Sequence, residues 1–226
     1  KNNELDVKKG LLERSKEGNI RLKQLHEFSS NKPEEIGYPV NPEIKDKRGV
    51  VNIYEDYNPN FSYYAGVDSV EADITDTSES LFSIVIYRRA YTEIDTITGK
   101  VKMIRGKVVA IWSGRFNSTE ETNEHGAFLL EMYKARAACE RNKPGFINYC
   151  RRNGLSKLIA RRNELPFDKD IDVTASENDL FGVYNDSAGK LRAELVRVTK
   201  EYLNAEVDLI YFDVREDQDY GKIKKI

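Results

Sequence analysis

Cysteine and histidine are scarce in this chain, with two residues of each among 226. Cys139 and Cys150 cannot build a disulfide framework or a four-ligand zinc site. His26 and His125 lie far apart in the sequence and add little to either possibility. A reducing cytoplasmic setting is therefore expected. Any metal ion would be held by carboxylates, which suit hard cations such as Mg²⁺ or Mn²⁺.

Long apolar runs are also missing. The longest, residues 82–87 and 108–112, have the length of strands, so no membrane-spanning helix is expected. The chain begins Lys-Asn-Asn-Glu, and no apolar segment of the kind found in a secretory signal peptide follows. We therefore expect a protein that is not secreted. The chain begins with Lys1 instead of methionine, as expected of a segment cut from a longer polypeptide, although processing would leave the same beginning.

Several catalytic signatures are absent as well. The sequence holds no phosphate-binding Gly-x-x-x-x-Gly-Lys-Ser/Thr loop, no dinucleotide fingerprint and no nucleophile elbow, so no ATPase motor is expected within these residues. The net charge is −2 and lacks the basic surplus of most nucleic-acid-binding proteins. For a nuclease this objection is weaker, because an acidic metal cluster lowers the sum while DNA contacts need only a local basic face.

Two regions are expected from the pattern. Residues 1–48 are interpreted as a helical and linker extension, because apolar residues have helical spacing over 5–28 and prolines and glycines follow. Residues 49–226 are interpreted as the main domain. Strands are predicted there at residues 50–54, 61–67, 81–89, 101–112, 135–139, 155–160, 178–184 and 207–214. Helices are predicted at residues 119–134, 144–154 and 189–203.

The order of these elements predicts an α/β fold. Three strands in succession, with a turn at residues 98–100, form an antiparallel meander. Helices then alternate with further strands, which is typical of parallel crossovers. The sequence therefore predicts a mixed sheet covered by helices.

Two acids follow two of the predicted strands. Asp68 comes directly after the strand at 61–67, and Glu140 directly after the strand at 135–139. If the two strands are neighbours, both carboxylates project from the same end of the sheet. Two carboxylates that lie close together resist ionising unless a cation sits between them. The alternative is that Asp68 caps a turn and that Glu140 is simply solvated.

Other charged residues are candidates for supporting roles. Asp73 lies in an acidic loop and is a candidate secondary metal ligand, with an exposed turn as the alternative. The most basic stretch is a candidate DNA-phosphate contact, or else a charged surface with ordinary salt bridges; it comprises Arg151, Arg152, Lys157, Arg161 and Arg162. A second basic candidate lies on the predicted strand pair and comprises Arg88, Arg89, Lys102, Arg105 and Lys107.

Three segments carry a resemblance to a known family. Residues 63–68 (YYAGVD) with residues 80–89, the segment at 50–55, and residues 138–147 (ACERNKPGFI) resemble the nuclease domain of the large terminase subunit of tailed bacteriophages. The resemblance covers about residues 49–204. It implies a ribonuclease H-like fold, which the predicted element order also matches.

The resemblance implies a function and its site. Asp68 and Glu140 would bind two Mg²⁺ or Mn²⁺ ions and cleave concatemeric double-stranded viral DNA during genome packaging. Residues 1–48 would be the end of a preceding ATPase domain. The implied partners are the portal and the small terminase subunit, and the implied location is the cytoplasm of the infected host.

One departure from the family pattern concerns the third metal-binding acid, which the family supplies near its C-terminus. Asp208 is the nearest candidate and, like Asp213, has the alternating context of a strand. The resemblance therefore implies that the domain at 49–226 could lack its C-terminal end and, with it, the third ligand. Three alternatives stay open. The chain could be another ribonuclease H-like nuclease of the resolvase, recombinase or transposase type, a non-catalytic DNA-binding or assembly module, or a phage structural protein with residues 1–50 as an oligomerisation arm.

Overall fold

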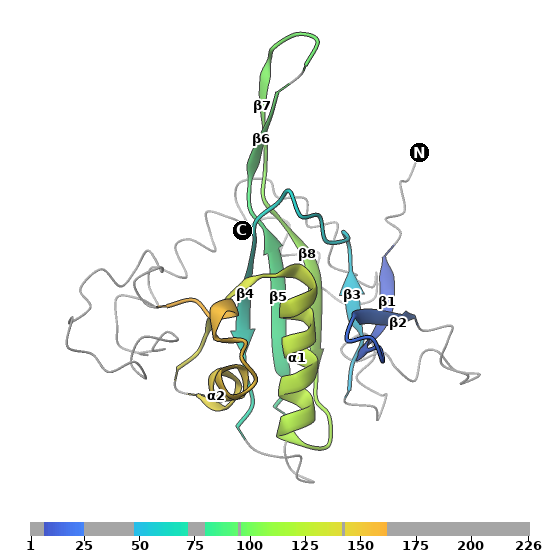
Figure 1. Ribbon diagram of the computed structural model, residues 1–226, viewed down its shortest axis with the longest axis vertical. Coiled ribbons are helices and arrows are strands. Elements are labelled where there is room, and N and C mark those ends of the chain that lie inside the picture. Colours follow the sequence, from blue (N-terminus) through green and yellow to red (C-terminus); the bar gives the residue numbers. More distant parts are fainter. Residues whose placement is uncertain (1–6, 25–47, 72–79, 95, 142, 162–226) are drawn as a thin grey trace, which may run out of the picture. The chain divides into compact units, whose positions relative to one another are not determined.

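A seven-stranded sheet with two helices forms the described part of the chain in the computed structural model, which comprises residues 7–24, 48–71, 80–94, 96–141 and 143–161 (Figure 1). All of these residues belong to the unit Lys1–Tyr184, one of two into which the chain divides. The elements are β1 (Lys8–Arg14), β2 (Ile20–Gln24), β3 (Val51–Ile53), β4 (Tyr63–Asp68), β5 (Phe82–Arg88), β6 (Tyr91–Ile94), β7 (Val101–Ile104), β8 (Lys107–Gly114), α1 (Thr119–Tyr133), β9 (Arg136–Cys139), α2 (Gly145–Arg152) and the 3-10 turn η3 (Ser156–Leu158).

The strands of the main sheet are ordered β2-β1-β3-β8-β5-β4-β9. Every neighbouring pair is antiparallel except β4 and β9, which run parallel. Strands β6 and β7 form a separate two-stranded ribbon. The described residues thus form an α/β structure with a mixed sheet, as the sequence predicts.

Helix α1 connects β8 to β9, and β9 lies parallel to β4. It begins where the sequence predicts, because the Ser118 side chain accepts a hydrogen bond of 3.2 Å from the backbone N–H of Glu121 and so caps the first turn. It ends at Lys134, whose φ of 49° breaks the helix before β9. A parallel return of this kind needs a long connection, which the helix supplies.

Both helices cover one face of the sheet (Figure 1). Alternate strand residues point toward them and form the core, in which the rings of Phe82 and Trp112 lie 5.3 Å apart and those of Phe82 and Phe146 lie 5.1 Å apart. Gly126 allows α1 to approach closely, because a Cβ there would lie 2.6 Å from the Phe82 ring. Burial of these large side chains is the main stabilising contribution to the packing of the helices on the sheet.

The helix expected over residues 5–28 is wrong for the residues that the structure describes. Residues 8–24 form the hairpin β1–β2, with Gly18 at a φ of 86° in its turn. Strand β1 also pairs with β3, so the hairpin extends the main sheet. Apolar residues such as Ile20 and Leu22 alternate as a strand requires, and tertiary pairing overrode the helical spacing. The assignment of residues 1–48 to a preceding domain stays a prediction.

Two predicted strands differ in detail. The long strand at 101–112 is divided into β7 and β8 at Gly106, where a Cβ would collide with the Tyr87 side chain. The strand at 155–160 is wrong, because η3 occupies its centre and only a parallel bridge between Ala137 and Ile159 remains. The predicted elements at residues 178–184, 189–203 and 207–214 lie outside the described residues.

No helix in the part of the chain that the structure describes is long and apolar enough to cross a membrane.

Candidate metal centre

Asp68 and Glu140 lie at the same edge of the sheet, on neighbouring strands. Asp68 is the last residue of β4, and Glu140 directly follows β9. The parallel register pairs Val67 with Cys139, so the next residues of the two strands are Asp68 and Glu140. The expectation that the two strands are neighbours and place both carboxylates at one end is confirmed.

Lys143 joins the two carboxylates. Its Nζ lies 2.6 Å from Asp68 Oδ1 and 3.4 Å from Glu140 Oε2, so one cation contacts both acids. The hydrogen bond to Asp68 is the largest cause of a raised Lys143 pKa, which keeps the ammonium charged. The Asp68 side chain is 63% exposed and that of Glu140 19%, so the pair is open to solvent on the Asp68 side.

The loop that carries Lys143 is fixed by two further contacts. Ser69 Oγ donates a hydrogen bond of 3.0 Å to the Lys143 carbonyl, and the Gly145 N–H donates one of 3.0 Å to Glu71 Oε1. Ser69 and Glu71, in the segment after β4, therefore hold the start of α2 in place. This arrangement determines where Lys143 stands relative to Asp68.

The carboxylate pair has the donor chemistry of a site for a hard cation. Oxygen ligands suit Mg²⁺ and Mn²⁺, and the pair already accommodates one positive charge between its members. Asp68 and Glu140 would hold the ion, and Lys143 would have to move aside. Within the described ranges, no group of three or more His, Cys, Asp or Glu side chains could hold a metal ion. A complete site would therefore need a further ligand, and the candidates Asp73 and Asp208 lie outside those ranges.

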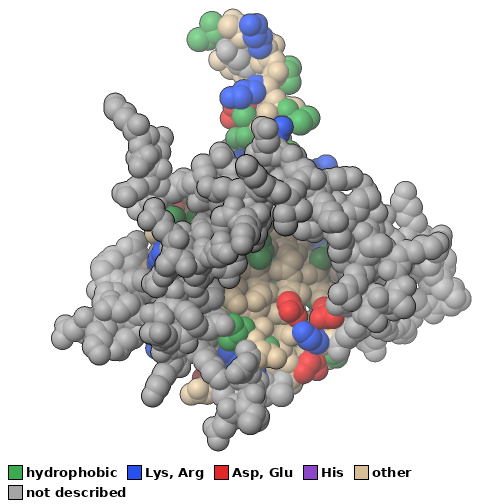
Figure 2. All heavy atoms as spheres, turned by 180° about the vertical axis from the view of Figure 1, so that it is seen from behind, with side chains coloured by type: hydrophobic (Ala, Val, Ile, Leu, Met, Phe, Trp, Pro, Cys, Tyr) green, Lys and Arg blue, Asp and Glu red, His purple; other side chains and the backbone are tan. Residues whose placement is uncertain are grey.

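The candidate site opens on the sheet face opposite the helices. Along β4, Tyr64, Gly66 and Asp68 are exposed, while the residues between them are buried. Asp68 pairs with Ser83 across β5, and Ser83 Oγ lies 2.8 Å from Ser113 Oγ on β8. From this side, acidic side chains are seen gathered around a basic one (Figure 2). The hydroxyl side chains of Ser83 and Ser113 therefore lie beside Asp68 on the neighbouring strands.

The predicted basic stretch is not part of this cluster. Arg151 and Arg152 lie in the last turn of α2, whereas Lys143 precedes its first residue. Arg152 forms an ion pair of 3.0 Å with Glu120 on α1, and Lys157 and Arg161 are exposed beyond α2. Arg162 lies outside the described residues. A role of these cations in DNA binding stays a prediction.

Both cysteines are free and buried, as befits core residues. Burial raises the pKa of Cys150 to about 12 and also raises that of Cys139, so both thiols stay protonated at neutral pH. Neither residue is a metal ligand or a nucleophile in this state.

Sequence reasoning missed Lys143 and Glu71. Lys143 stands three residues after Glu140, and this spacing brings the two charges to 3.4 Å in the connection between β9 and α2. That signal was present in the sequence. The role of Glu71 at the start of α2 joins segments 74 positions apart and has no local signature.

Comparison of the chain with protein-family models, curated proteins and solved structures finds no match.

Proposed function

We propose that this chain is a divalent-metal-dependent endodeoxyribonuclease of the ribonuclease H-like class, similar to the nuclease domain of phage large terminase subunits. The observation that carries the proposal is the placement of Asp68 and Glu140 at the ends of two parallel strands, on either side of the Lys143 ammonium. The meander β4–β5–β8, the crossover helix α1 and the parallel strand β9 follow the element order expected of that class.

In this proposal each residue of the cluster has a distinct task. Asp68 and Glu140 bind Mg²⁺ or Mn²⁺ at the open edge of the sheet. The bound cation supplies Lewis-acid stabilisation of the charge that develops on phosphodiester oxygens. Lys143 keeps the two carboxylates close together and offsets one of their two charges until the metal ion takes its place.

The substrate in this proposal is double-stranded DNA. Phosphate contacts position a duplex without reading its sequence, so cleavage would be largely sequence-independent. Concatemeric viral DNA during packaging, the portal and small terminase subunit as partners, and the host cytoplasm as location follow from the terminase resemblance and are part of the proposal.

Plasmid digestion tests the proposal. The purified chain is incubated with supercoiled plasmid in Mn²⁺, Mg²⁺ or EDTA, beside Asp68→Asn and Glu140→Gln. Glu120→Gln is the matched control, because Glu120 is an exposed acid that pairs with Arg152 outside the cluster. We expect metal-dependent nicking or linearisation that both site variants lose and the control keeps. Cleavage that persists in Asp68→Asn would contradict the proposal.

A second candidate function is a non-catalytic DNA-binding or assembly module. The observation that favours it is the ion pairing itself, because Lys143 already contacts both carboxylates and gives them a structural role. This candidate predicts no nuclease activity with any metal, and no heat of Mn²⁺ binding that depends on Asp68. Plasmid digestion and calorimetry together separate the two functions.

A further inference from the structure

The ribbon β6–β7 projects from the main sheet and exposes apolar side chains (Figure 1). Five large hydrophobic residues are exposed in the described part of the chain, and four of them belong to this ribbon and its tip. They are Ile94 (66% exposed), Ile97 (94%), Val101 (67%) and Met103 (72%). Single exposed apolar residues are ordinary, but a group of four on one projecting element indicates a binding surface.

The ribbon has two different faces. Residues that pair directly across an antiparallel ladder point to the same side, so Ile94, Val101 and Met103 share one face with Thr92. The other face carries Glu93 opposite Lys102, together with Tyr91 opposite Ile104. Ile97 stands at the tip, next to the turn at Gly99.

The ribbon and its root are locally basic within an acidic protein. The whole chain has a net charge of −2, whereas residues 89–107 hold five bases and only two acids, Glu93 and Asp95. The bases are Arg89, Lys100, Lys102, Arg105 and Lys107, of which Lys107 forms an ion pair with Glu55. Lys100 and Lys102 are exposed, and long lysine stems let an ammonium reach past the edge of a strand.

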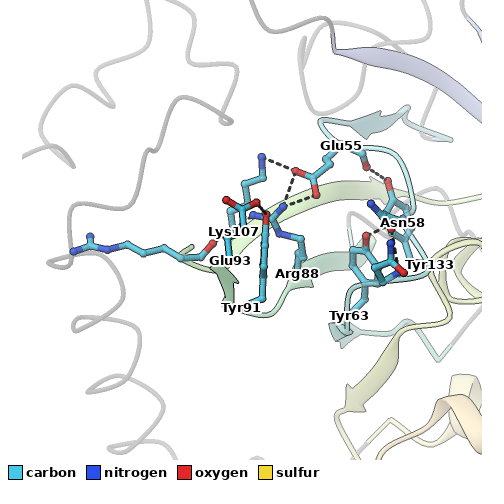
Figure 3. A network of polar contacts seen from close by, with 10 residues as sticks. Glu55, Asn58, Tyr63, Arg88, Tyr91, Glu93, Lys107 and Tyr133 are labelled. Atoms are coloured by element: carbon cyan, nitrogen blue, oxygen red, sulfur yellow. Dashed lines mark hydrogen bonds and ion pairs between the residues drawn. The ribbon is translucent and has the colours of Figure 1, made fainter. Parts of the chain in front are cut away.

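A partly buried polar network fixes the root of the ribbon (Figure 3). Arg88, the last residue of β5, donates hydrogen bonds of 2.9 and 3.2 Å to the Glu55 carboxylate, which also binds Lys107 at 2.6 Å. The Arg88 guanidinium lies 5.0 Å from the ring centroids of Phe61 and Tyr91. Since Tyr91 begins β6 and Lys107 begins β8, both strands of the ribbon are anchored beside this network.

We propose that the ribbon β6–β7 inserts into a groove of double-stranded DNA. A two-stranded ribbon fits the major groove in width, and apolar side chains contact the methyl groups of thymines there. The apolar face and Ile97 contact the groove interior, and Lys100 and Lys102 contact the phosphates of its walls. The local surplus of positive charge selects a polyanion over an uncharged partner surface.

The position of the ribbon relative to Asp68 fits a single duplex. Asp68 pairs with Ser83 near the start of β5, and the ribbon leaves the other end of β5 at Arg88. At about 3.3 Å per residue, the chain from Ser83 to Ile97 places the tip up to roughly 46 Å from the carboxylates, which lies within the length of two helical turns of DNA. The inference takes its substrate from the proposed function and adds a second contact with it, remote from the metal site.

DNA binding without metal tests the inference. The affinity of the full chain for a fluorescent duplex of about two helical turns is measured by anisotropy in EDTA over a range of salt concentrations. We expect Lys100→Ala with Lys102→Ala to lower the slope of log affinity against log salt by about one for each lysine. We expect Ile97→Ser to weaken binding about tenfold, the order for an isoleucine that loses a buried contact.

Two controls match these variants. Ile97→Leu keeps an apolar tip and is expected to bind as the unaltered chain does, and Lys16→Ala removes an exposed lysine from the turn after β1 without changing the salt slope. Unchanged DNA affinity in the ribbon variants would overturn the inference. So would a dimer, seen by light scattering, that Ile97→Ser dissociates with no effect on DNA binding, because the apolar face would then bind a second copy.

The inference and the proposed function fail separately. Binding that depends on the ribbon in a chain that never cleaves plasmid would support the ribbon contact and contradict the nuclease. Cleavage that depends on Asp68, with a rate and a DNA affinity that the ribbon variants leave unchanged, would support the nuclease and contradict the ribbon contact.

Discussion

His125 lies in an aromatic pocket that holds its imidazole neutral. The ring centroid is 4.6 Å from that of Trp112 and 4.9 Å from that of Phe116, and Nε2 finds no hydrogen-bond partner in the described part of the chain. Burial lowers the His125 pKa to about 3, and a hydrogen bond with the Leu12 backbone offsets only part of this shift. The residue is a core histidine, and its unpaired nitrogen makes it sensitive to acid.

Acidification is expected to destabilise the fold through His125. The unfolded chain takes up this proton near the ordinary histidine pKa of 6.5, but the folded chain takes it up only near 3, so stability is complete above pH 6.5 and falls as the pH drops toward 3. Between pH 7 and pH 5 the free energy of unfolding should fall by about 2 kcal/mol more in the unaltered chain than in His125→Phe. Urea unfolding at both pH values measures the difference, and equal losses in the two proteins would contradict the expectation.

Lys143 is expected to compete with metal for the carboxylates. In EDTA, Lys143→Met should lower the free energy of unfolding by about 1 kcal/mol or less, because the ion pairs are partly exposed. In Mn²⁺ the same variant should gain more thermal stability than the unaltered chain, because no ammonium has to leave. Lys100→Met, which alters an exposed lysine outside the site, is the control. An Mn²⁺ response identical in all three proteins would argue against competition.

At the scale of elements, the network under the ribbon is expected to control how firmly β6 and β7 are held. Arg88→Met leaves the Glu55 carboxylate with Lys107 as its ion-pair partner among the described residues and should lower the free energy of unfolding by about 1–3 kcal/mol. Amide hydrogen exchange in Tyr91–Ile104 should quicken in this variant. Arg89→Met changes the exposed neighbour and should leave exchange unaltered. Equal exchange in the two variants would show that the root does not hold the ribbon.

The elements that the sequence predicts well are those with strong local signals. Helix α1 has a capping serine and a long periodic face, and β4 and β5 alternate cleanly between buried and exposed residues. The apolar spacing of the hairpin β1–β2 fits the period of a helix as well as that of a strand. Its pairing with β3 decides in favour of the strands. The division between β7 and β8 depends on the contact of Gly106 with Tyr87, which no local pattern encodes.

At the scale of the whole described sheet, the sequence predicted part of the candidate site but not the projecting ribbon. The sequence placed Asp68 and Glu140 at the ends of two strands, and their adjacency depended on those strands being neighbours, which the parallel pairing of β4 with β9 confirms. The apolar face of the ribbon was not predicted, because exposure on a projecting element is a property of the assembled sheet. The second basic candidate of the sequence included Lys102 on the ribbon but not Lys100.

Titration of the purified chain with Mn²⁺ by calorimetry tests most directly whether the carboxylate pair is a cation site. We expect saturable binding to the unaltered chain that Asp68→Asn abolishes and that Glu120→Gln preserves, because Glu120 is an acid outside the cluster. Variants that remain folded by circular dichroism make the comparison valid. Binding that survives unchanged in Asp68→Asn, or no binding to the unaltered chain, would contradict the assignment of Asp68 and Glu140 as metal ligands.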